Sequence, residues 1–455
     1  LNEKGERTVQ LTVPAGPTGL ALDEPRNRLY VLSKFDAAIS TIDLADDRVI
    51  STTNLFDPTP EVIKKGRPHL YNATKSSGLG HLSCATCHVD ARMDPLAWDL
   101  GDPAGEIKEF NQTCNIGLLQ LECKDWHPMK GPMTTQTLIG TVGNRPLHWR
   151  GDREDIAAFN GAFESLLGAE AQLSDEDMAE FEAFLATIVH PPNPNRRLDG
   201  TLRDAMQLRG RAASPARGFD LFQNAASDRD LLKCVDCHAL PQGVSPVVVG
   251  GSILASPQQA VISQLENIYE KTGFDVTSRN NNRGFGLTHD GAFDHVANFL
   301  THPVFTLPTD QDRLDLEAFV LSFSTTTHAA VGKQVTLNGN PMMDADSLKL
   351  LDDLRREADG LRCGLVALGR RDGAMRGFVY RKGPRDFETD GNPSNIAFAD
   401  LVASAKPGAE LTFTAVPIGA ERRIAFDRDE DGVPDLDDAA TGRAIGREWF
   451  APPAD

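Results

Sequence analysis

The chain has 455 residues, and its 65 acidic and 46 basic residues give a formal net charge of −19 at pH 7. That length suggests about three domains, and a composition of 40% hydrophobic and 24% charged residues excludes a wholly disordered protein. The acidic balance without a basic patch argues against nucleic-acid binding, and no apolar run is long enough to predict a transmembrane helix.

The chain begins with four predicted β-strands. Alternating apolar residues between turn signals place them at Thr8–Val13, Gly19–Asp23, Arg28–Ser33 and Ala38–Leu44. Their combined length is that of one β-propeller blade, and residues 17–32 resemble blades of the YVTN type. Because one blade cannot bury its own faces, we expect residues 1–56 to pack either on further blades or on the part of the chain that follows.

Residues 57–200 and 201–328 repeat one order of features. Each stretch carries a Cys-x-x-Cys-His segment and closes on a helix with an N-capping residue and an acidic first turn, capped by Ser174 and Thr309. Such a repetition predicts two similar modules.

The remaining residues, 329–455, are predicted to form a small α/β or β-rich unit. A helix around Asp346–Ala358 precedes strands at Leu365–Gly369, Gly377–Arg381 and Leu411–Val416.

The two Cys-x-x-Cys-His segments have the pattern that attaches c-type haem. Each supplies two thiols that add across the haem vinyl groups and a histidine that binds the iron: Cys84, Cys87, His88, Cys234, Cys237 and His238. A chain of this composition contains roughly 0.003 such matches by chance, and a zinc site would need the two Cys pairs about 15–20 residues apart. The sequence therefore predicts two covalently attached haems c, in a mainly α fold with β additions that contains two cytochrome c-like modules.

Covalent haem also predicts the compartment. Because haem c is attached outside the bacterial cytoplasm, we expect a periplasmic, extracellular or surface-attached protein, where disulfides persist. Cys114 and Cys123 lie close enough in sequence to pair, whereas Cys363 has no evident partner.

Residues 75–325, which contain these two segments, resemble the bacterial di-haem cytochrome c peroxidase and MauG-like superfamily. The resemblance is carried by His127-Pro-Met-Lys-Gly-Pro, by His148-Trp-Arg-Gly-Asp-Arg, and by His289-Asp-Gly in the second half. It implies that His127 is the distal ligand of the first haem, offset by one residue, and that Trp149 lies between the haems. It also implies a catalytic glutamate about 20 residues after the tryptophan, a position near Glu170 and close to Glu164.

Several ligand assignments stay open. Met129 or Met133 could replace His127 as sixth ligand, and His148 could be a distal ligand, a propionate partner or a polar rim residue. At the second haem the family's distal Met or Tyr is missing, which leaves His302 and His289 as candidates.

An aspartate-rich loop near the end of the chain fits a calcium-binding register. Acidic residues occupy positions 1, 3, 5, 9 and 12 around a glycine at position 6: Asp427, Asp429, Asp431, Asp435 and Asp438, with Gly432. We expect Ca²⁺ to tie down the tail and to take no part in catalysis.

Two functions follow from these features. The first is a peroxidase or MauG-like oxidoreductase, in which one haem opens to peroxide and a positioned acid helps to cleave the O–O bond. The second is a non-enzymatic electron carrier with both irons permanently six-coordinate. The expected partners are a redox protein or a small-molecule oxidant, with self-assembly left open, and the net charge favours a basic docking surface on any partner.

Overall fold

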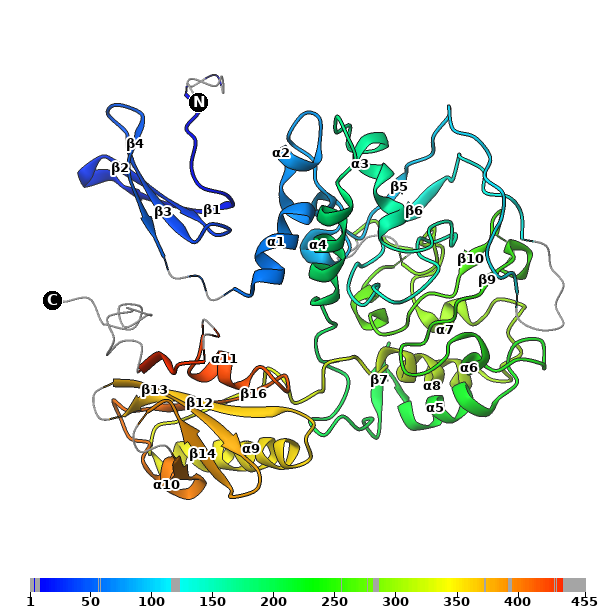
Figure 1. Cartoon of the computed structure of the whole chain (residues 1–455). Coiled ribbons are helices and arrows are strands. Elements are labelled where there is room, and N and C mark those ends of the chain that lie inside the picture. Colours follow the sequence, from blue (N-terminus) through cyan, green and yellow to red (C-terminus); the bar gives the residue numbers. More distant parts are fainter. Residues whose placement is uncertain are drawn as a thin grey trace. The chain divides into compact units, whose positions relative to one another are not determined.

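A computed structural model describes residues 4, 9–55, 57, 59–115, 123–254, 256–275, 277–280, 286–371, 374–391, 395–428, 430 and 432–436. The chain divides into two compact units, Leu1–Lys64 with Gln334–Asp455 and Lys65–Lys333 (Figure 1). The structure is mixed α/β, with 27% helix and 22% strand. It therefore contains more strand than the mainly α fold that the sequence predicts.

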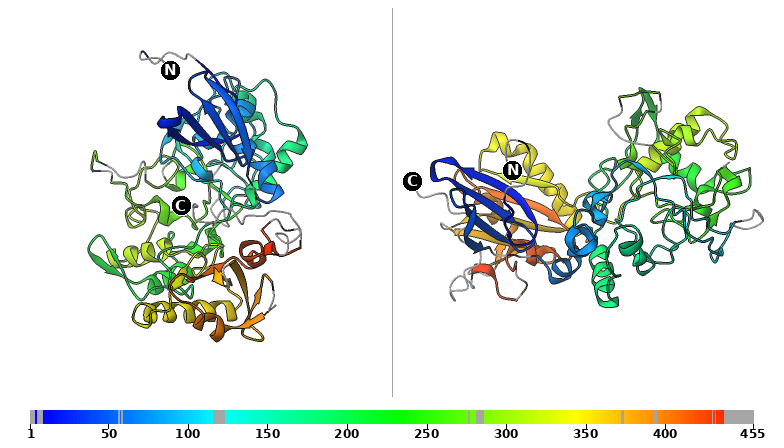
Figure 2. Two further views of the ribbon diagram at one scale, coloured as in Figure 1. Left: turned by 90° about the vertical axis from the view of Figure 1, so that its left-hand side faces the viewer. Right: turned by 90° about the horizontal axis from the view of Figure 1, so that it is seen from above.

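The N-terminal sheet is a four-stranded antiparallel meander. Its order is β1 (Pro17–Asp23), β2 (Arg28–Ser33), β3 (Ala38–Asp43) and β4 (Arg48–Asn54), and the strands stay side by side in Figure 2. The predicted strand at Thr8–Val13 is wrong, because residues 9–13 belong to no strand. The fourth strand instead follows the Asp46-Asp47 turn, where the β-branched residues of β4 pair with β3.

One face of this sheet is only partly covered. Val31 and Ile42 are buried in its centre, whereas Leu20 and Leu22 on the edge strand β1 are 72% and 59% exposed. The blade-like sheet thus has an apolar edge.

The C-terminal sheet has six antiparallel strands in the order β11-β16-β12-β13-β14-β15. Its elements are β11 (Gln334–Leu337), α9 (Pro341–Asp359), β12 (Gly364–Arg371), β13 (Ala374–Arg381), β14 (Asp386–Thr389), β15 (Asn395–Ala397), α10 (Phe398–Ala403), β16 (Leu411–Val416) and α11 (Glu421–Ala425). Val366 and Val379 pack with Ala425 and Phe426 at α11 on one face. On the alternate residues of β13, Tyr380 donates a hydrogen bond to Asp359 of α9 and packs on Phe398 of α10. The predicted helix and three strands of this region are confirmed.

The unit Lys65–Lys333 contains both Cys-x-x-Cys-His segments. Its elements, with α1 beginning just before it, are α1 (Glu61–Tyr71), α2 (Ala73–Ser76), β5 (Ala97–Asp99), β6 (Pro132–Thr134), α3 (Gly161–Ser165), α4 (Asp175–Ala186), β7 (Met206–Leu208), β8 (Arg211–Ala213), α5 (Pro215–Asn224), α6 (Cys234–Cys237), β9 (Val248–Val249), β10 (Ala260–Val261), α7 (Val296–Phe299) and α8 (Asp310–Leu321). Within the described residues, no helix is long and apolar enough to cross a membrane.

Two pairs of helices cross closely in this unit, and each crossing has a glycine at the contact. A Cβ added to Gly66 of α1 would lie 2.2 Å from Phe184 Cβ of α4, and one added to Gly218 of α5 would lie 1.9 Å from the Asp315 carbonyl of α8. Neither position has room for a Cβ atom. The two halves therefore share a helix crossing that requires glycine.

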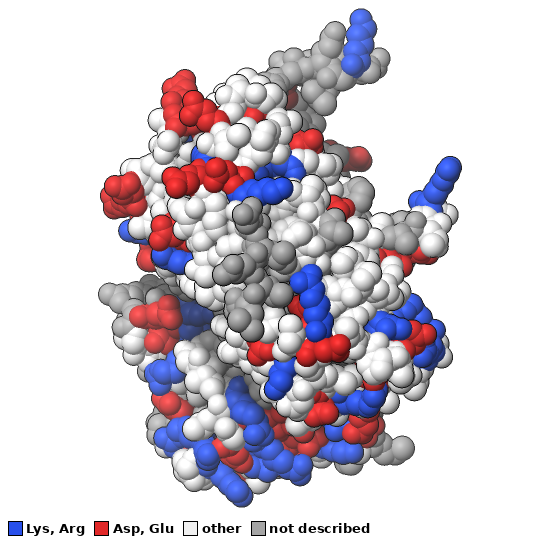
Figure 3. Space-filling view, turned by 90° about the vertical axis from the view of Figure 1, so that its right-hand side faces the viewer, with Lys and Arg blue, Asp and Glu red and all other residues white. Residues whose placement is uncertain are grey.

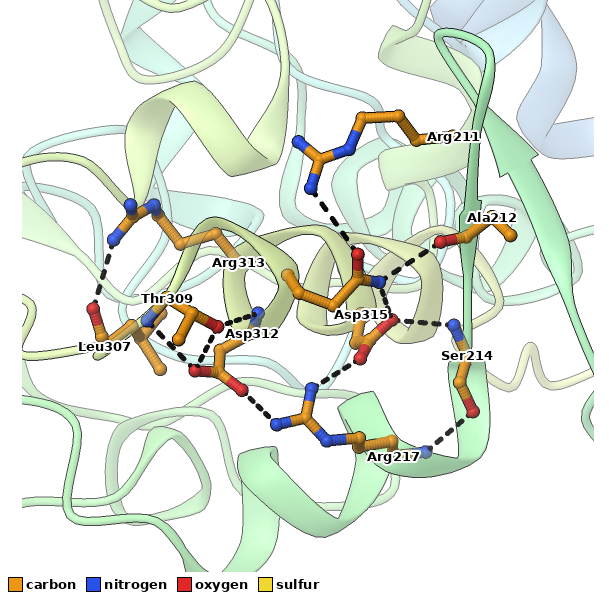
Figure 4. Close-up of polar contacts among 10 residues, drawn as sticks. Arg211, Ala212, Ser214, Arg217, Leu307, Thr309, Asp312, Arg313 and Asp315 are labelled. Atoms are coloured by element: carbon orange, nitrogen blue, oxygen red, sulfur yellow. Dashed lines mark hydrogen bonds and ion pairs between the residues drawn. The ribbon is translucent and has the colours of Figure 1, made fainter.

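The α5–α8 pair is also held by an ion-pair network (Figure 4). The Arg217 guanidinium contacts the carboxylates of Asp312 and Asp315, which are both buried. Asp312 in turn accepts hydrogen bonds from the backbone and hydroxyl of Thr309, the N-cap of α8. Elsewhere on the molecule, the face drawn in Figure 3 carries acidic and basic side chains interspersed.

Arg217→Met should lower the free energy of unfolding at pH 7 by about 2 kcal/mol, because it leaves two buried carboxylates without their cation. Burial raises the pKa of Asp312, but hydrogen bonds from Thr309 and Arg217 outweigh it and hold that pKa below its ordinary value. The stabilisation is therefore complete above the unfolded-state pKa of about 3.9 and is lost as the pH falls through the folded-state value. Urea unfolding should show the difference from wild type shrinking below pH 4.

The matched control is Arg211→Met. The Arg211 side chain is exposed and makes one long hydrogen bond, of 3.4 Å, to Gln311. It should change stability by less than about 0.5 kcal/mol. Equal losses in the two variants would contradict the role of Arg217.

Candidate functional site

The two Cys-x-x-Cys-His segments fold into the same local turn. The amide of His88 donates to the Cys84 carbonyl at 2.9 Å, and the amide of His238 donates to the Cys234 carbonyl at 2.8 Å. In each segment, the side chain of the residue directly before the second cysteine also closes the turn. Thr86 Oγ1 accepts a hydrogen bond from the Ser83 amide, and Asp236 Oδ2 accepts one from the Lys233 amide. Helical spacing thus projects the side chains of each segment from a single turn.

Both histidines commit the same ring nitrogen to the backbone. His88 Nδ1 donates to the Gln136 carbonyl and His238 Nδ1 to the Gly243 carbonyl, each at 2.8 Å. Desolvation by burial lowers the pKa of both rings and favours the neutral form that binds metals. Metal-binding histidines characteristically make this second hydrogen bond, which leaves Nε2 as the ligand nitrogen.

The four cysteines of these segments take no part in a disulfide. Burial raises the pKa of Cys84 and of Cys237 to about 11, and it also raises the pKa of Cys87 and Cys234. Among the described residues, no Cys takes part in a group of three or more potential metal ligands. Two thiols followed by a histidine are the groups that covalent attachment of haem c uses.

Apolar side chains are exposed along the chain around the first segment. Between residues 79 and 100 the large hydrophobic side chains that are at least 38% exposed are Leu79, Leu82, Val89, Leu96, Trp98 and Leu100. These side chains are therefore free to contact an apolar group.

The pKa of His88 is lowered mainly by burial, and the charge of His148 lowers it further. His148 Nδ1 donates to Asp152 Oδ1 at 2.6 Å, and Asp152 is also paired with Arg150 and Arg153. His148 has a positive φ of 71°, a conformation that costs about 1 kcal/mol or more for a side chain of this type. This orientation is therefore held by the surrounding contacts.

His127 is placed differently. Its side chain is exposed and its Nδ1 accepts a hydrogen bond from the Met129 amide in the same turn. Met129 is 44% exposed, whereas Met133 is buried in β6. Glu170 is exposed in the segment between α3 and α4, and His302 is half-buried, with Nδ1 accepting from the Val304 amide.

Trp149 is buried where the two sequence halves meet. Its indole Nε1 donates to the Thr134 carbonyl at 2.7 Å, and the Thr134 amide donates to the His289 carbonyl at 2.7 Å. Its own carbonyl accepts from the Val261 amide, and the ammonium of Lys271 lies 5.5 Å from the indole ring. Backbone hydrogen bonds thus bring together Trp149 and His289, which the sequence singled out separately.

The predicted disulfide is confirmed between Cys114 and Cys123. The adjoining backbone pairs with the second half, because Val248 donates to the Thr113 carbonyl and accepts from the Asn115 amide. Cys363 is buried, and burial raises the pKa of its thiol to about 11.

The predicted calcium loop is described only in part. Asp429, Asp431 and Asp438 lie outside the described residues. Asp427 is buried, Gly432 has a φ of +88°, and Asp435 is paired with Arg428. Calcium binding by this loop therefore stays a prediction.

Sequence reasoning missed one cluster of potential ligands. His69 of α1 lies against Asp177 and Glu180 of α4. The available signal was weak, because a histidine three residues after Gly66 and an Asp-x-x-Glu pair become neighbours only through the helix crossing.

Trp149→Phe should lower the free energy of unfolding by about 1–3 kcal/mol, because the half-buried Thr134 carbonyl loses its indole donor. Trp98→Phe is the matched control, since Trp98 is 41% exposed and its hydrogen bond to Asp94 is open to solvent. That variant should stay within about 0.5 kcal/mol of wild type in urea unfolding. Indistinguishable variants would show that the Trp149 hydrogen bond does not stabilise the junction.

No family model matches the chain, and no curated protein matches it. Among solved structures, that of Kuenenia stuttgartiensis hydrazine synthase pressurised with 20 bar xenon is similar, covering 58% of this chain and 88% of that chain. The sequence identity is 15% and the TM-score is 0.38. A likeness of that degree assigns neither a fold nor a function to this chain.

Proposed function

We propose that the chain is a di-haem c-type redox protein. Haem would be attached at Cys84 with Cys87 and at Cys234 with Cys237, and His88 and His238 would bind the irons through Nε2. The observation that carries the proposal is the shared turn in which each histidine gives Nδ1 to a backbone carbonyl. The exposed apolar side chains of residues 79–100 fit the same proposal, because a porphyrin has large apolar faces. A periplasmic, extracellular or surface-attached location accompanies it.

Electron transfer is the function that this arrangement supports best. When bound, each haem supplies an iron centre that takes up and releases an electron. Trp149 is buried at the junction of the two sequence halves, where Thr134 connects its indole to His289. A rigid aromatic group in this position suits the passage of electrons from one half to the other, with a redox protein as external partner.

A peroxidase-like activity is the second candidate, and His148 favours it. This histidine is held by Asp152 and lies near His88, so it can either bind the first iron or move a proton beside it. Glu170, the acid implied by the resemblance, is exposed. The candidate activity therefore depends on the His148–Asp152 pair.

Haem attachment can be counted directly. After expression with a c-type maturation system, the absorbance of the pyridine haemochrome should correspond to two haems per chain. Cys84→Ser with Cys87→Ser, and Cys234→Ser with Cys237→Ser, should each reduce it by half, because each removes one pair of thioether bonds. Cys363→Ser is the control and should retain two haems. A wild-type chain without covalent haem would disprove the proposal.

His148→Ala and His127→Ala separate the two candidate functions. If His148 binds the first iron, its removal converts one haem from low spin to high spin in ferric EPR spectra, whereas His127→Ala leaves both signals unchanged. A His148→Ala variant that keeps its spin state but loses its reaction with peroxide would instead support the peroxidase-like function. Loss of a low-spin signal in His127→Ala alone would assign the ligand to His127.

A further inference from the structure

A buried histidine faces two carboxylates across the α1–α4 crossing. The His69 side chain is 1% exposed, and its Nε2 lies 3.5 Å from Asp177 Oδ1 and 3.6 Å from Glu180 Oε2. These separations exceed a good N–H···O hydrogen bond. Within the described part of the chain, neither ring nitrogen of His69 has a hydrogen-bond partner.

An imidazole with two unsatisfied nitrogens is costly in a protein interior. Desolvation is the largest influence on its pKa and, with the positive charge of Lys75, lowers it. Asp177 and Glu180 oppose that lowering. In its neutral form the ring carries a free lone pair on one nitrogen. A cation between the ring and the carboxylates would use that lone pair.

We propose that His69, Asp177 and Glu180 form a binding site for Zn²⁺ or a divalent transition metal of the same class. The three ligand atoms lie within 4.8 Å of one another. Two bonds of about 2.1 Å at a tetrahedral angle separate their ligand atoms by about 3.4 Å, close to the two distances from His69 Nε2. One nitrogen with two carboxylate oxygens is a donor set that zinc accepts, with solvent as fourth ligand.

The remaining carboxylate oxygens are already held. Asp177 Oδ2 accepts from the Ser174 hydroxyl at 3.0 Å, and Glu180 Oε1 is 3.5 Å from Lys65 Nζ. Such outer contacts orient metal-binding carboxylates. Lys75 Nζ, 3.2 Å from Asp177 Oδ1, competes for the oxygen that faces His69, but its side chain is 46% exposed and can turn to solvent.

The second half of the same unit provides an internal comparison. There the corresponding pair on α8, Asp312 and Asp315, also lies three residues apart after the N-cap and faces α5. Arg217, the residue before Gly218, neutralises both carboxylates. In the first half two lysines share that task, because Lys65 pairs with Glu180 and Lys75 with Asp177. The buried ring of His69 lies beside both acids there.

The test measures zinc bound by the purified full-length chain after treatment with a chelator. Equilibrium dialysis and elemental analysis should show one more zinc per chain in wild type than in His69→Gln or in Asp177→Asn with Glu180→Gln. A hundredfold excess of Zn²⁺ over its dissociation constant should shift the folded-to-unfolded ratio of the wild type about a hundredfold in urea. That shift should be lost in both variants.

Asp175→Asn with Glu176→Gln is the matched control, because it removes the same charge from exposed positions of the same helical turn. It should keep the zinc and the shift. Lys75→Met should bind zinc several-fold more tightly, because it removes the competing cation. Should His69→Gln fail to fold, the Asp177–Glu180 variant decides. Equal zinc content and equal shifts in wild type and that variant would overturn the proposal, as would a wild-type chain that binds none.

Discussion

Close helix crossing at glycine is the constraint on which the Lys65–Lys333 unit depends. At Gly66 and Gly218 the backbone of one helix meets a residue of its partner at distances that no side chain could occupy. Close approach brings residues on the neighbouring turns into range of each other. It explains why each crossing carries its own set of charged contacts, with Lys65 and His69 on one and Arg217 on the other.

Backbone and side-chain hydrogen bonds both connect the two sequence halves. Backbone hydrogen bonds join Thr134 to His289 and Trp149 to Val261, and the segment beside the disulfide is joined in the same way to Val248. Because amide and carbonyl groups are the partners, these contacts tolerate side-chain substitution better than a junction made of specific side chains. Side chains cross the junction as well, because Gln264 donates to the Ile139 carbonyl and Arg92 pairs with Glu270.

The features that the sequence predicts correctly are local ones. Capping by Ser174 and Thr309, the disulfide and the C-terminal strands depend on neighbouring residues or on strong periodicity. The strand at Thr8–Val13 was wrong because apolar alternation cannot tell which segment finds a partner. Which histidine lies near His88 depends on burial and on how distant segments pack in three dimensions. The spacing of residues in a motif measures separation along the sequence only. The His69 cluster, assembled from two helices, was invisible for the same reason.

The apolar edge of the N-terminal sheet affects how the protein behaves at high concentration. Strand β1 presents Leu20 and Leu22 to solvent beside the backbone groups of an edge strand, without a lysine or a bulge at those two positions. Edges of this kind invite strand pairing between molecules. Colloidal stability, and with it the choice of buffer and expression level, therefore rests on long-range repulsion from the net charge of −19. Salt shortens the range of that repulsion, which is about 10 Å at 0.1 M ionic strength and less above it. We therefore expect this chain to precipitate at high salt concentration.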